Sequence, residues 1–232
     1  MVITPDLIVV FGAAGGMGRA VTRLARNQGF RVIGYDKFPR IDDEFEVREL
    51  DACDPVEVEK GLSDALRHAN GGRVAVVDAV GVPSRGTVAD VTPEEFDRVI
   101  NINLRSAYLI TQGLVRLLRS GACSWAGIIH IASGAGALGA TDRFAYSVAK
   151  AGLLGLCKQV ARDFKDDSFR IVAISPGLVD TDFATPMLTA EEREEYRERR
   201  ADSISADGIA ELALWTIRHG MIAMHGGSLD VY

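Results

Sequence analysis

Short apolar runs alternate along the chain with longer segments of helical periodicity. The apolar runs are typical of parallel strands buried on both faces, and they lie at residues 7–11, 30–35, 45–50, 74–77, 127–133, 169–175 and 228–232. Gly71 and Gly72 are predicted to break the chain before the fourth run. Helical periodicity predicts helices at about 19–28, 55–68, 93–119, 143–164, 190–200 and 205–219. This alternation predicts an α/β fold with a doubly wound parallel sheet of about seven strands flanked by helices.

Two of the predicted helices begin with a capping residue followed by proline. Asp54 precedes Pro55, and Thr92 precedes Pro93. The capping side chain satisfies free N–H groups of the first turn, and proline suits the first helical position, where its missing N–H is not needed. Glu95 lies three residues after Thr92, as in a capping box.

A glycine-rich turn links the first strand to the first helix. From Gly12 to Gly18 it reads GAAGGMG, a G-x-x-x-G-x-G spacing. Glycine lets the backbone approach a phosphate closely, and the start of the following helix presents free N–H groups. The turn therefore predicts a nucleotide-binding loop with contacts from Gly12, Gly16, Met17 and Gly18. A tight strand-to-helix turn without a ligand is the alternative.

Acidic residues end the second and third strands. Asp36 lies where a dinucleotide site holds the hydroxyls of the adenosine ribose. A carboxylate there repels the 2′-phosphate of NADP and favours NAD, whereas Lys37, the next residue, can receive that phosphate. Asp51 and Ala52 are predicted to lie on the adenine side. A solvated loop carboxylate at Asp36 and a turn carboxylate at Asp51 are the alternatives.

Tyr146 and Lys150 lie four residues apart in the predicted helix 143–164. Residues at i and i+4 share one helix face, so the phenol and the ammonium can point into one pocket. The positive charge is expected to lower the Tyr146 pKa from about 10 and make the phenol a usable acid or base. Ser133, at the end of the run 127–133, is expected at the edge of the sheet. Taken alone, the Tyr-x-x-x-Lys spacing also suits an exposed helix face.

Composition and charge narrow the classes of partner. The chain has 232 residues, 47% of them hydrophobic, which is enough for one large α/β domain. The net charge of −6 argues against a nucleic acid or an anionic membrane as partner. The uncharged run 120–141 is rich in glycine and fits a buried strand and loop better than a membrane span. The absence of a signal-peptide pattern, of C-x-x-C spacing and of a histidine cluster predicts a cytoplasmic protein without a metal site.

In their order and spacing, these motifs resemble those of the short-chain dehydrogenase/reductase family. The resemblance covers nearly the whole chain and rests on the glycine-rich turn, Asp36, Asp51, Asn103, Ser133, Tyr146-x-x-x-Lys150 and Pro176-Gly177 through Thr181. It implies one Rossmann-like domain over residues 1–232, with a cofactor half at about 1–120 and a catalytic and substrate half at about 121–232. It also implies NAD or NADP as the cofactor.

The resemblance implies a role for each matched residue. Tyr146 would exchange a proton with the substrate oxygen while hydride moves to or from the nicotinamide ring, and Ser133 would hold that oxygen. Lys150 would bind the nicotinamide ribose and lower the Tyr146 pKa, and Asn103 would hold a water of a proton relay. Further cofactor contacts would come from Pro176, Gly177, Val179 and Thr181.

Two positions depart from the family pattern. Phe11 stands where the family usually has Thr before the first glycine, and Asp78-Ala79-Val80-Gly81 stands for Asn-Asn-Ala-Gly. We expect altered packing rather than lost catalysis, with Asp78 weakening dinucleotide binding. The family commonly forms dimers or tetramers through the helices at about 93–119 and 144–165, so a homo-oligomer is expected.

The sequence therefore predicts an NAD-dependent oxidoreductase that interconverts a secondary alcohol and a ketone on a small molecule. The alternatives are an NADP-dependent ketone or 3-oxoacyl-thioester reductase and a catalytically idle dinucleotide-binding regulator. The loop after Ser133, residues 83–88 and the segment 182–200, whose charge-dense part predicts a solvated helix or a lid, are expected to select the substrate. The first of these is small and apolar, which favours a weakly charged substrate. Arg85 and Arg143 are either receivers of a substrate anion or solvated surface residues.

Overall fold

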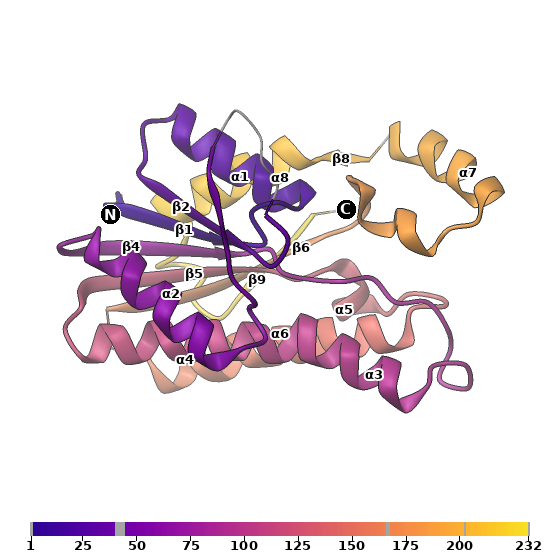
Figure 1. Cartoon of the computed structure of the whole chain (residues 1–232), viewed down its shortest axis with the longest axis horizontal. Coiled ribbons are helices and arrows are strands. Elements are labelled where there is room, and N and C mark those ends of the chain that lie inside the picture. Colours follow the sequence, from indigo (N-terminus) through magenta and orange to yellow (C-terminus); the bar gives the residue numbers. More distant parts are fainter. Residues whose placement is uncertain (1, 40–44, 166–167, 202, 232) are drawn as a thin grey trace.

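The computed structural model describes residues 2–39, 45–165, 168–201 and 203–231. Its centre is a parallel sheet of seven strands between two layers of helices (Figure 1). In order across the sheet the strands are β3 (Val47–Glu49), β2 (Val32–Asp36), β1 (Leu7–Phe11), β4 (Gly71–Asp78), β5 (Cys123–Ile131), β6 (Phe169–Pro176) and β9 (Ser228–Val231). The strand order reverses between β1 and β4, as in a doubly wound sheet. The predicted fold class is confirmed.

Helices cover both faces of the sheet (Figure 1). One face packs against α1 (Gly16–Asn27) and α8 (Ala206–Trp215), and the other against α2 (Pro55–Arg67), α4 (Ser106–Arg119) and α6 (Phe144–Asp163). Successive residues of a strand point to opposite faces. Leu7, Val9 and Phe11 of β1 therefore belong to the core under α2, α4 and α6, and Ile8 and Val10 to the core under α1 and α8. Because both faces are covered, the strand shows no polar alternation.

The two predicted helix starts are confirmed by their hydrogen bonds. The Asp54 carboxylate accepts from the backbone N–H groups of Val56 (2.8 Å) and Glu57 (3.1 Å) and caps α2. The Thr92 hydroxyl accepts from the N–H of Glu95 (3.2 Å) at the start of α3 (Pro93–Ile100). Each side chain satisfies N–H groups that a helix leaves free in its first turn.

A wider turn interrupts the helix predicted for residues 93–119. Between α3 and α4 lies the π-helical segment η1 (Asn101–Arg105). The side-chain amide of Asn103 donates to the Val99 carbonyl (3.0 Å), the group that the Asn103 backbone N–H would bind in a regular α-helix. A side chain inserted into the hydrogen-bond ladder in this way widens a helix locally. Asn103 is 1% exposed, so a buried contact sets the position of this turn.

Some element boundaries differ from the prediction. β4 begins at Gly71, so the prediction of a break at Gly71 and Gly72 is wrong; Gly71 has a positive φ of 77° and pairs in register with Cys123. The helix predicted at 205–219 is α8, which continues as the π-helical segment η3 (Thr216–Gly220). The last strand ends at Val231, and residue 232 lies outside the described part of the chain.

The sequence does not predict the short elements beyond the carboxyl ends of β5 and β6. They are α5 (Gly134–Leu138), the parallel pair β7 (Val179–Asp180) and β8 (Ile204–Ser205), and the 3-10 segment η2 (Asp182–Met187). The charge-dense run at 190–200 is helical, as predicted, and forms α7 (Ala190–Ala201), which projects away from the sheet (Figure 1). These elements surround the carboxyl edge of the sheet, where the candidate site lies.

Candidate active site

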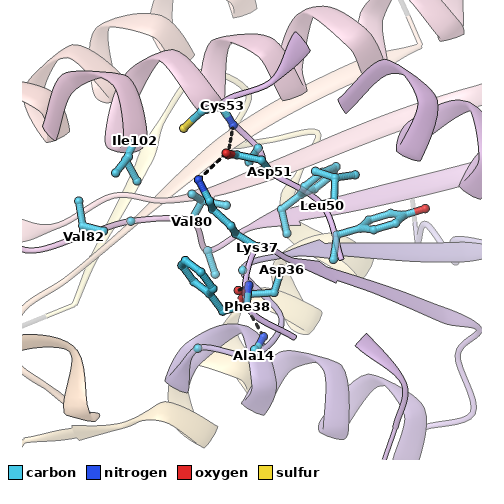
Figure 2. A pocket seen from close by; sticks show the side chains of 17 residues that line it. Ala14, Asp36, Lys37, Phe38, Leu50, Asp51, Cys53, Val80, Val82 and Ile102 are labelled. Atoms are coloured by element: carbon cyan, nitrogen blue, oxygen red, sulfur yellow. Dashed lines mark hydrogen bonds and ion pairs between the residues drawn. The ribbon is translucent and has the colours of Figure 1, made fainter. Parts of the chain in front are cut away.

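A cavity of about 360 Å³ opens at the carboxyl ends of β1, β2 and β4, where the strand order reverses (Figure 2). Connections on the two sides of this point run to opposite faces of the sheet and leave a crevice in which doubly wound folds bind ligands. The cavity brings together the residues predicted for the adenosine side, which are Gly12, Asp36, Lys37, Asp51 and Ala52.

Three glycines of the turn, Gly12, Gly16 and Gly18, leave no room for side chains. Gly12 has a positive φ of 74°, and a Cβ on it would lie 2.8 Å from the Ala79 carbonyl. A Cβ on Gly18 would lie 2.1 Å from the Gly12 carbonyl oxygen, and one on Gly16 would lie 2.5 Å from Cγ2 of Thr181. The helix α1 begins at Gly16 without a side-chain cap, so its first N–H groups face a ligand site rather than a capping residue.

Asp36 stands at the end of β2 on the wall of the 360 Å³ cavity. Its carboxylate accepts hydrogen bonds from the backbone N–H groups of Ala14 (3.0 Å) and Phe38 (2.9 Å). The bond from Ala14 joins β2 to the glycine-rich turn and fixes the carboxylate beside the start of α1 (Figure 2). Each carboxylate oxygen can accept more than one hydrogen bond, so Asp36 can still receive a ligand hydroxyl.

Lys37 is held by the neighbouring acid. Its ammonium donates to Asp51 (2.6 Å), whose other oxygen accepts from the N–H of Cys53 (2.9 Å) (Figure 2). The hydrogen bond to Asp51 raises the pKa of Lys37. Burial acts to raise the pKa of Asp51, but its bonds to Lys37 and Cys53 prevail and lower it. The cation predicted to receive a 2′-phosphate is thus neutralised by Asp51.

The sequence interpretation missed part of the wall of this cavity. Val80, Val82 and Ile102 line it (Figure 2), and their apolar side chains suit a flat ring system. Val80 and Val82 could have been predicted from the sequence, because residues that follow a strand at the point where the strand order reverses line the crevice. The place of Ile102 depends on the π-helical turn of η1, which no sequence pattern indicates.

Ser133, Tyr146 and Lys150 lie together beyond the carboxyl end of β5. Ser133 caps α5, and its hydroxyl accepts from the N–H of Ala135 (3.2 Å). Tyr146 and Lys150 are one turn apart on α6, and Lys150 Nζ lies 5.8 Å from the centre of the Tyr146 ring. Lys150 is 3% exposed, and its ammonium donates to the Ile131 carbonyl (2.8 Å) at the end of β5.

The prediction of a lowered Tyr146 pKa is wrong for this structure. Burial raises the pKa of Tyr146, and a hydrogen bond with Ser133 and the charge of Arg143 offset that rise only in part. Burial also lowers the pKa of Lys150 to about 8, against the attraction of Asp78. Loss of water disfavours both charged forms, the phenolate and the ammonium. In this structure that effect on the two pKa values is larger than the opposing effect of neighbouring charges and hydrogen bonds. At neutral pH the tyrosine is a protonated phenol and the lysine is mostly charged.

Tyr146 lines two further cavities. A small one of about 80 Å³ is bounded by the glycine-rich turn, Lys150 and Thr181. A larger one of about 440 Å³ is bounded by Ser133, the segment after β6, η2 and α7. The small cavity shares residues 79–81 with the 360 Å³ cavity and Thr181 with the 440 Å³ cavity. The three cavities form one groove along the carboxyl edge of the sheet, which we call the active-site groove.

The segment after β6 closes the groove at Tyr146. The larger cavity is lined by the predicted residues Met17, Pro176, Gly177, Val179 and Thr181. Pairing of β7 with β8 holds this segment in place. Phe183, which the sequence interpretation did not single out, lies with its ring centre 5.9 Å from that of Tyr146 and lines both the small and the larger cavity.

The side chain of Asn103 forms hydrogen bonds with backbone groups. Its Oδ1 accepts from the N–H of Val82 (3.2 Å), and its Nδ2 donates to the Val82 carbonyl (3.0 Å) as well as to that of Val99. These bonds fix the residues after β4 beside Lys150, since a Cβ on Gly81 would lie 2.9 Å from Asn103 Oδ1 and 3.5 Å from Lys150 Nζ. Asn103 therefore positions one wall of the groove, and its predicted water stays a prediction.

Comparisons with known proteins agree with this geometry. The family described as Enoyl-(Acyl carrier protein) reductase matches residues 12–231. The short-chain dehydrogenase/reductase olcF of Penicillium canescens is 32% identical over 80% of this chain and 74% of its own. The chain belongs to the short-chain dehydrogenase/reductase family. It is accordingly an oxidoreductase of that family.

Further short-chain dehydrogenases/reductases and a solved structure extend the comparison. Dehydrogenase/reductase SDR family member 6 of Xenopus laevis is 29% identical and covers 90% of this chain and 88% of its own. The ligand-free aldohexose dehydrogenase of Thermoplasma acidophilum superposes with a TM-score of 0.86 over 98% of this chain and 92% of its own, at 19% identity. That likeness concerns the fold. No helix in the described ranges has the length and apolar character to cross a bilayer.

The two departures from the family pattern are both buried. Phe11 is 1% exposed, and its ring centre lies 5.5 Å from that of Tyr35. Asp78 is 3% exposed and lies 2.7 Å from His130 Nδ1, while His130 Nε2 lies 2.9 Å from the Thr111 hydroxyl. The register of β4 and β5 places Asp78 beside His130, a partner that the sequence interpretation missed. Asp78 thus joins a buried polar chain behind the groove, and its effect on dinucleotide affinity stays a prediction.

Proposed function

We propose that this short-chain dehydrogenase/reductase uses NAD to interconvert a secondary alcohol and a ketone on a small organic molecule. The observation that carries the proposal is the place of Tyr146, which lines both the small cavity at the glycine-rich turn and the larger cavity at Ser133. One proton-transfer group therefore faces the cofactor side and the substrate side of the groove. Hydride transfer coupled to proton transfer requires such a group.

The residues of the groove fit a dinucleotide. Gly12, Gly16 and Gly18 of the turn have no space for side chains, and the uncapped start of α1 offers N–H donors to a pyrophosphate. Asp36 would accept from the ribose hydroxyls and Ala52 would lie on the adenine side, while Lys150 and Thr181 would hold the nicotinamide end. When bound, NADH supplies the hydride for reduction and NAD accepts it in oxidation.

Within this proposal, Tyr146 gives a proton to the ketone oxygen in reduction and takes one from the alcohol in oxidation. Ser133 donates a second hydrogen bond to the same oxygen and stabilises the negative charge that develops on it. Because burial raises the pKa of Tyr146, the phenol is the resting form and is ready to act as an acid at neutral pH. The Lys150 ammonium stabilises the phenolate that remains after proton transfer.

Charge at the end of β2 favours NAD over NADP. The Asp36 carboxylate would stand beside a 2′-phosphate, and Lys37 is already paired with Asp51.

One observation favours the alternative, an NADP-dependent ketone or 3-oxoacyl-thioester reductase. The Lys37 side chain is 57% exposed, and exposed ion pairs are weak, so Lys37 can leave Asp51 for a phosphate. Calorimetric titration with NADH and NADPH side by side separates the two, because each proposal requires its own cofactor to bind more tightly.

Turnover tests the reaction itself. The purified protein is given NADH with a panel of ketones, and NAD with the corresponding secondary alcohols, while the nicotinamide absorbance is followed. Turnover in both directions supports the proposal. Tight dinucleotide binding without turnover on any panel member would contradict it and favour the catalytically idle regulator.

A cytoplasmic location and a homodimer or homotetramer belong to the same proposal. Exposed apolar side chains on the two expected interface helices support the oligomer: Tyr108 on α4 is 46% exposed and Val148 on α6 is 39% exposed. Light scattering on the purified protein gives the mass directly, and a monomeric mass would rule the oligomer out.

A further inference from the structure

The 440 Å³ cavity at Tyr146, the larger one described above, has mostly apolar walls. Arg143 is the one charged side chain among the described residues that line it. The others are aliphatic, aromatic, glycine, proline or neutral hydroxyl residues. A cation set in apolar walls indicates an anionic group on the ligand, because ion pairs are stronger where water is excluded.

Arg143 lies close to the proposed proton donor. It immediately precedes α6 and is three positions before Tyr146 in the chain. Burial raises the pKa of Tyr146 and the charge of Arg143 opposes that rise, so the guanidinium acts electrostatically on the phenol. A substrate group held by Arg143 and an oxygen held by Tyr146 can therefore belong to one small molecule.

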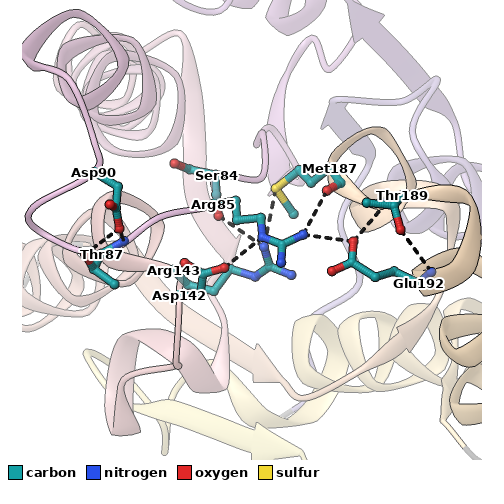
Figure 3. Close-up of polar contacts among 9 residues, drawn as sticks. All are labelled: Ser84, Arg85, Thr87, Asp90, Asp142, Arg143, Met187, Thr189 and Glu192. Carbon is teal, nitrogen blue, oxygen red and sulfur yellow. Dashed lines mark hydrogen bonds and ion pairs between the residues drawn. The ribbon is translucent and has the colours of Figure 1, made fainter.

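The two arginines at this end of the groove differ in their partners, and Arg85 is engaged by acids (Figure 3). Its Nε donates to Asp142 and its Nη1 to Glu192, each at 2.8 Å. Glu192 also accepts from the backbone N–H of Thr189 (2.8 Å), which keeps its carboxylate at the start of α7. Arg85 is thus paired with two acids, and it is not among the residues that line the 440 Å³ cavity.

In the described part of the chain Arg143 donates hydrogen bonds only to neutral groups, although the Glu192 carboxylate that holds Arg85 also acts on it electrostatically. Its Nη1 donates to the Ser84 carbonyl at 3.4 Å and lies 3.5 Å from the Met187 sulfur (Figure 3). The first contact is long for an N–H···O hydrogen bond, and the thioether sulfur in the second is a weak acceptor. A guanidinium carries five N–H donors, so most of its capacity stays free for a ligand.

We propose that the 440 Å³ cavity takes a small oxo or hydroxy acid, with its carboxylate on Arg143 and its reacting oxygen at Tyr146 and Ser133. The inference rests on the proposed function, because that function supplies the reacting oxygen. A guanidinium binds a carboxylate through two parallel N–H···O bonds. One cation matches the single charge of a carboxylate. Of the two arginines that the sequence offers as receivers of a substrate anion, the proposal selects Arg143. It also specifies the weakly charged substrate expected from the loop after Ser133 as a molecule with one negative charge.

Matched pairs of oxo acids and their methyl esters test the proposal. The probes are 2-oxobutanoate, 3-oxobutanoate and 4-oxopentanoate, each with its ester, reduced with whichever dinucleotide binds. For the best acid, we expect kcat/KM to exceed that of its ester by about tenfold or more, because hydrogen bonds between charged groups are the strong ones. Equal or better turnover of every ester would overturn the proposal.

Two variants of Arg143 assign the preference to its side chain. Arg143→Gln removes the charge, and we expect it to lower kcat/KM for the acid about 10- to 100-fold, mostly through KM. The ester should lose less, because it feels only the effect of the guanidinium on Tyr146. Arg143→Lys keeps the charge without the two parallel bonds, so it should recover part of the loss. Arg67→Ala, at an exposed site on α2, is the control for loss of an arginine and should change neither substrate. Equal losses for acid and ester in Arg143→Gln would overturn the proposal.

A binding measurement separates failure of this inference from failure of the proposed function. The same acids are titrated into the dinucleotide complex of the wild type and of Arg143→Gln, and thermal melting checks that both are folded. If neutral ketones are turned over but the acids do not bind, the proposed function stands and the proposal of an acid substrate is refuted. Acid binding that depends on Arg143 without any turnover supports the acid site and refutes the function. Absence of both refutes both.

Discussion

The two ends of the active-site groove present opposite charges and are held in different ways. At the end proposed for adenosine, the Asp36 carboxylate is fixed by backbone N–H groups of Ala14 and Phe38. At the end proposed for the substrate, Arg143 makes weak contacts with two neutral groups, the Ser84 carbonyl and the Met187 sulfur of η2. The first end is therefore preorganised by the sheet and the glycine-rich turn. The second end keeps its hydrogen-bonding capacity for the ligand.

This difference explains why one end can be shared by many family members and the other can be particular to this chain. Strand ends and side-chain-free glycines are fixed by the fold, as the short approach of Gly18 to Gly12 shows. The substrate end is made by residues 83–85, the loop after α5, η2 and α7, which the sheet does not constrain. Function in such folds is carried by loops on a rigid scaffold. Tyr146 lies where the two ends meet, and variants on either side of it can test the contrast.

The largest effect is expected at Tyr146. Tyr146→Phe keeps the aromatic ring beside Phe183 but removes the proposed proton donor. We expect kcat to fall about 100- to 10,000-fold, while the Kd for NADH, measured by calorimetry, stays within about threefold. Retained turnover together with loss of NADH binding would refute the assignment of Tyr146 to proton transfer.

The next effect is expected at the adenosine end. Asp36→Asn removes the charge and keeps one acceptor oxygen for the Ala14 N–H. NADH should bind about tenfold more weakly, because a charged acceptor is lost, and NADPH should bind more tightly, because repulsion of the 2′-phosphate is relieved. Parallel titrations with both cofactors measure the ratio of the two Kd values. An unchanged ratio would show that Asp36 does not select the cofactor.

The pH dependence of ketone reduction tests the electrostatics where the two ends meet. Burial lowers the pKa of Lys150 to about 8. The charged lysine is the form that stabilises the phenolate, so kcat/KM should be level below that pH and fall above it, towards tenfold per unit.

Asp78→Asn sharpens this test. Asp78 raises the pKa of Lys150 against the effect of burial, so removing its charge should move the alkaline limb to lower pH. Asparagine can keep the contacts with His130 and the Val80 N–H. If the alkaline limb of the pH profile stays at the same pH in this variant, Asp78 does not influence the pKa of Lys150.

The smallest effect is expected at Lys37. Its partner is Asp51 and its side chain is largely in solvent, so Lys37→Ala should change the Kd for NADH less than about threefold. A tenfold weaker NADPH affinity in the same variant would instead favour the NADP-dependent alternative, because it would show that Lys37 binds the 2′-phosphate.

The fold and the end of the groove proposed for the cofactor could be read largely from the sequence because short-range rules set them. The apolar run of β1 and the caps at Asp54 and Thr92 depend on neighbouring residues, and the structure confirms them. The glycine-rich turn and Asp36 come together because the carboxyl ends of neighbouring parallel strands meet at one edge. Ser133, Tyr146 and Lys150 are brought together for a similar reason, one at a strand end and two on one helix face.

The features that could not be predicted depend on contacts between distant parts of the chain. The pKa of Tyr146 is raised by burial, which depends on tertiary neighbours such as Phe183 and not on local spacing. The π-helical turn at Asn103 follows from its bonds to Val99 and Val82, the second of which is twenty-one positions away. The pairing of Arg85 with Glu192 spans more than a hundred residues and leaves Arg143 for the cavity. Such pairings follow from the tertiary structure and not from a sequence pattern.

The measurement that tests the central claim most directly is isotope transfer from NADH that carries deuterium at both positions of C4 of the nicotinamide, so that the transferred hydride is labelled whichever face reacts. Wild-type protein and Tyr146→Phe are incubated with labelled NADH and a ketone, and the alcohol is analysed by mass spectrometry. We expect deuterium on the carbinol carbon with the wild type and little labelled alcohol with the variant, although both bind NADH. Bound NADH with no label transferred by the wild type, or equal transfer by the variant, would contradict the role proposed for Tyr146.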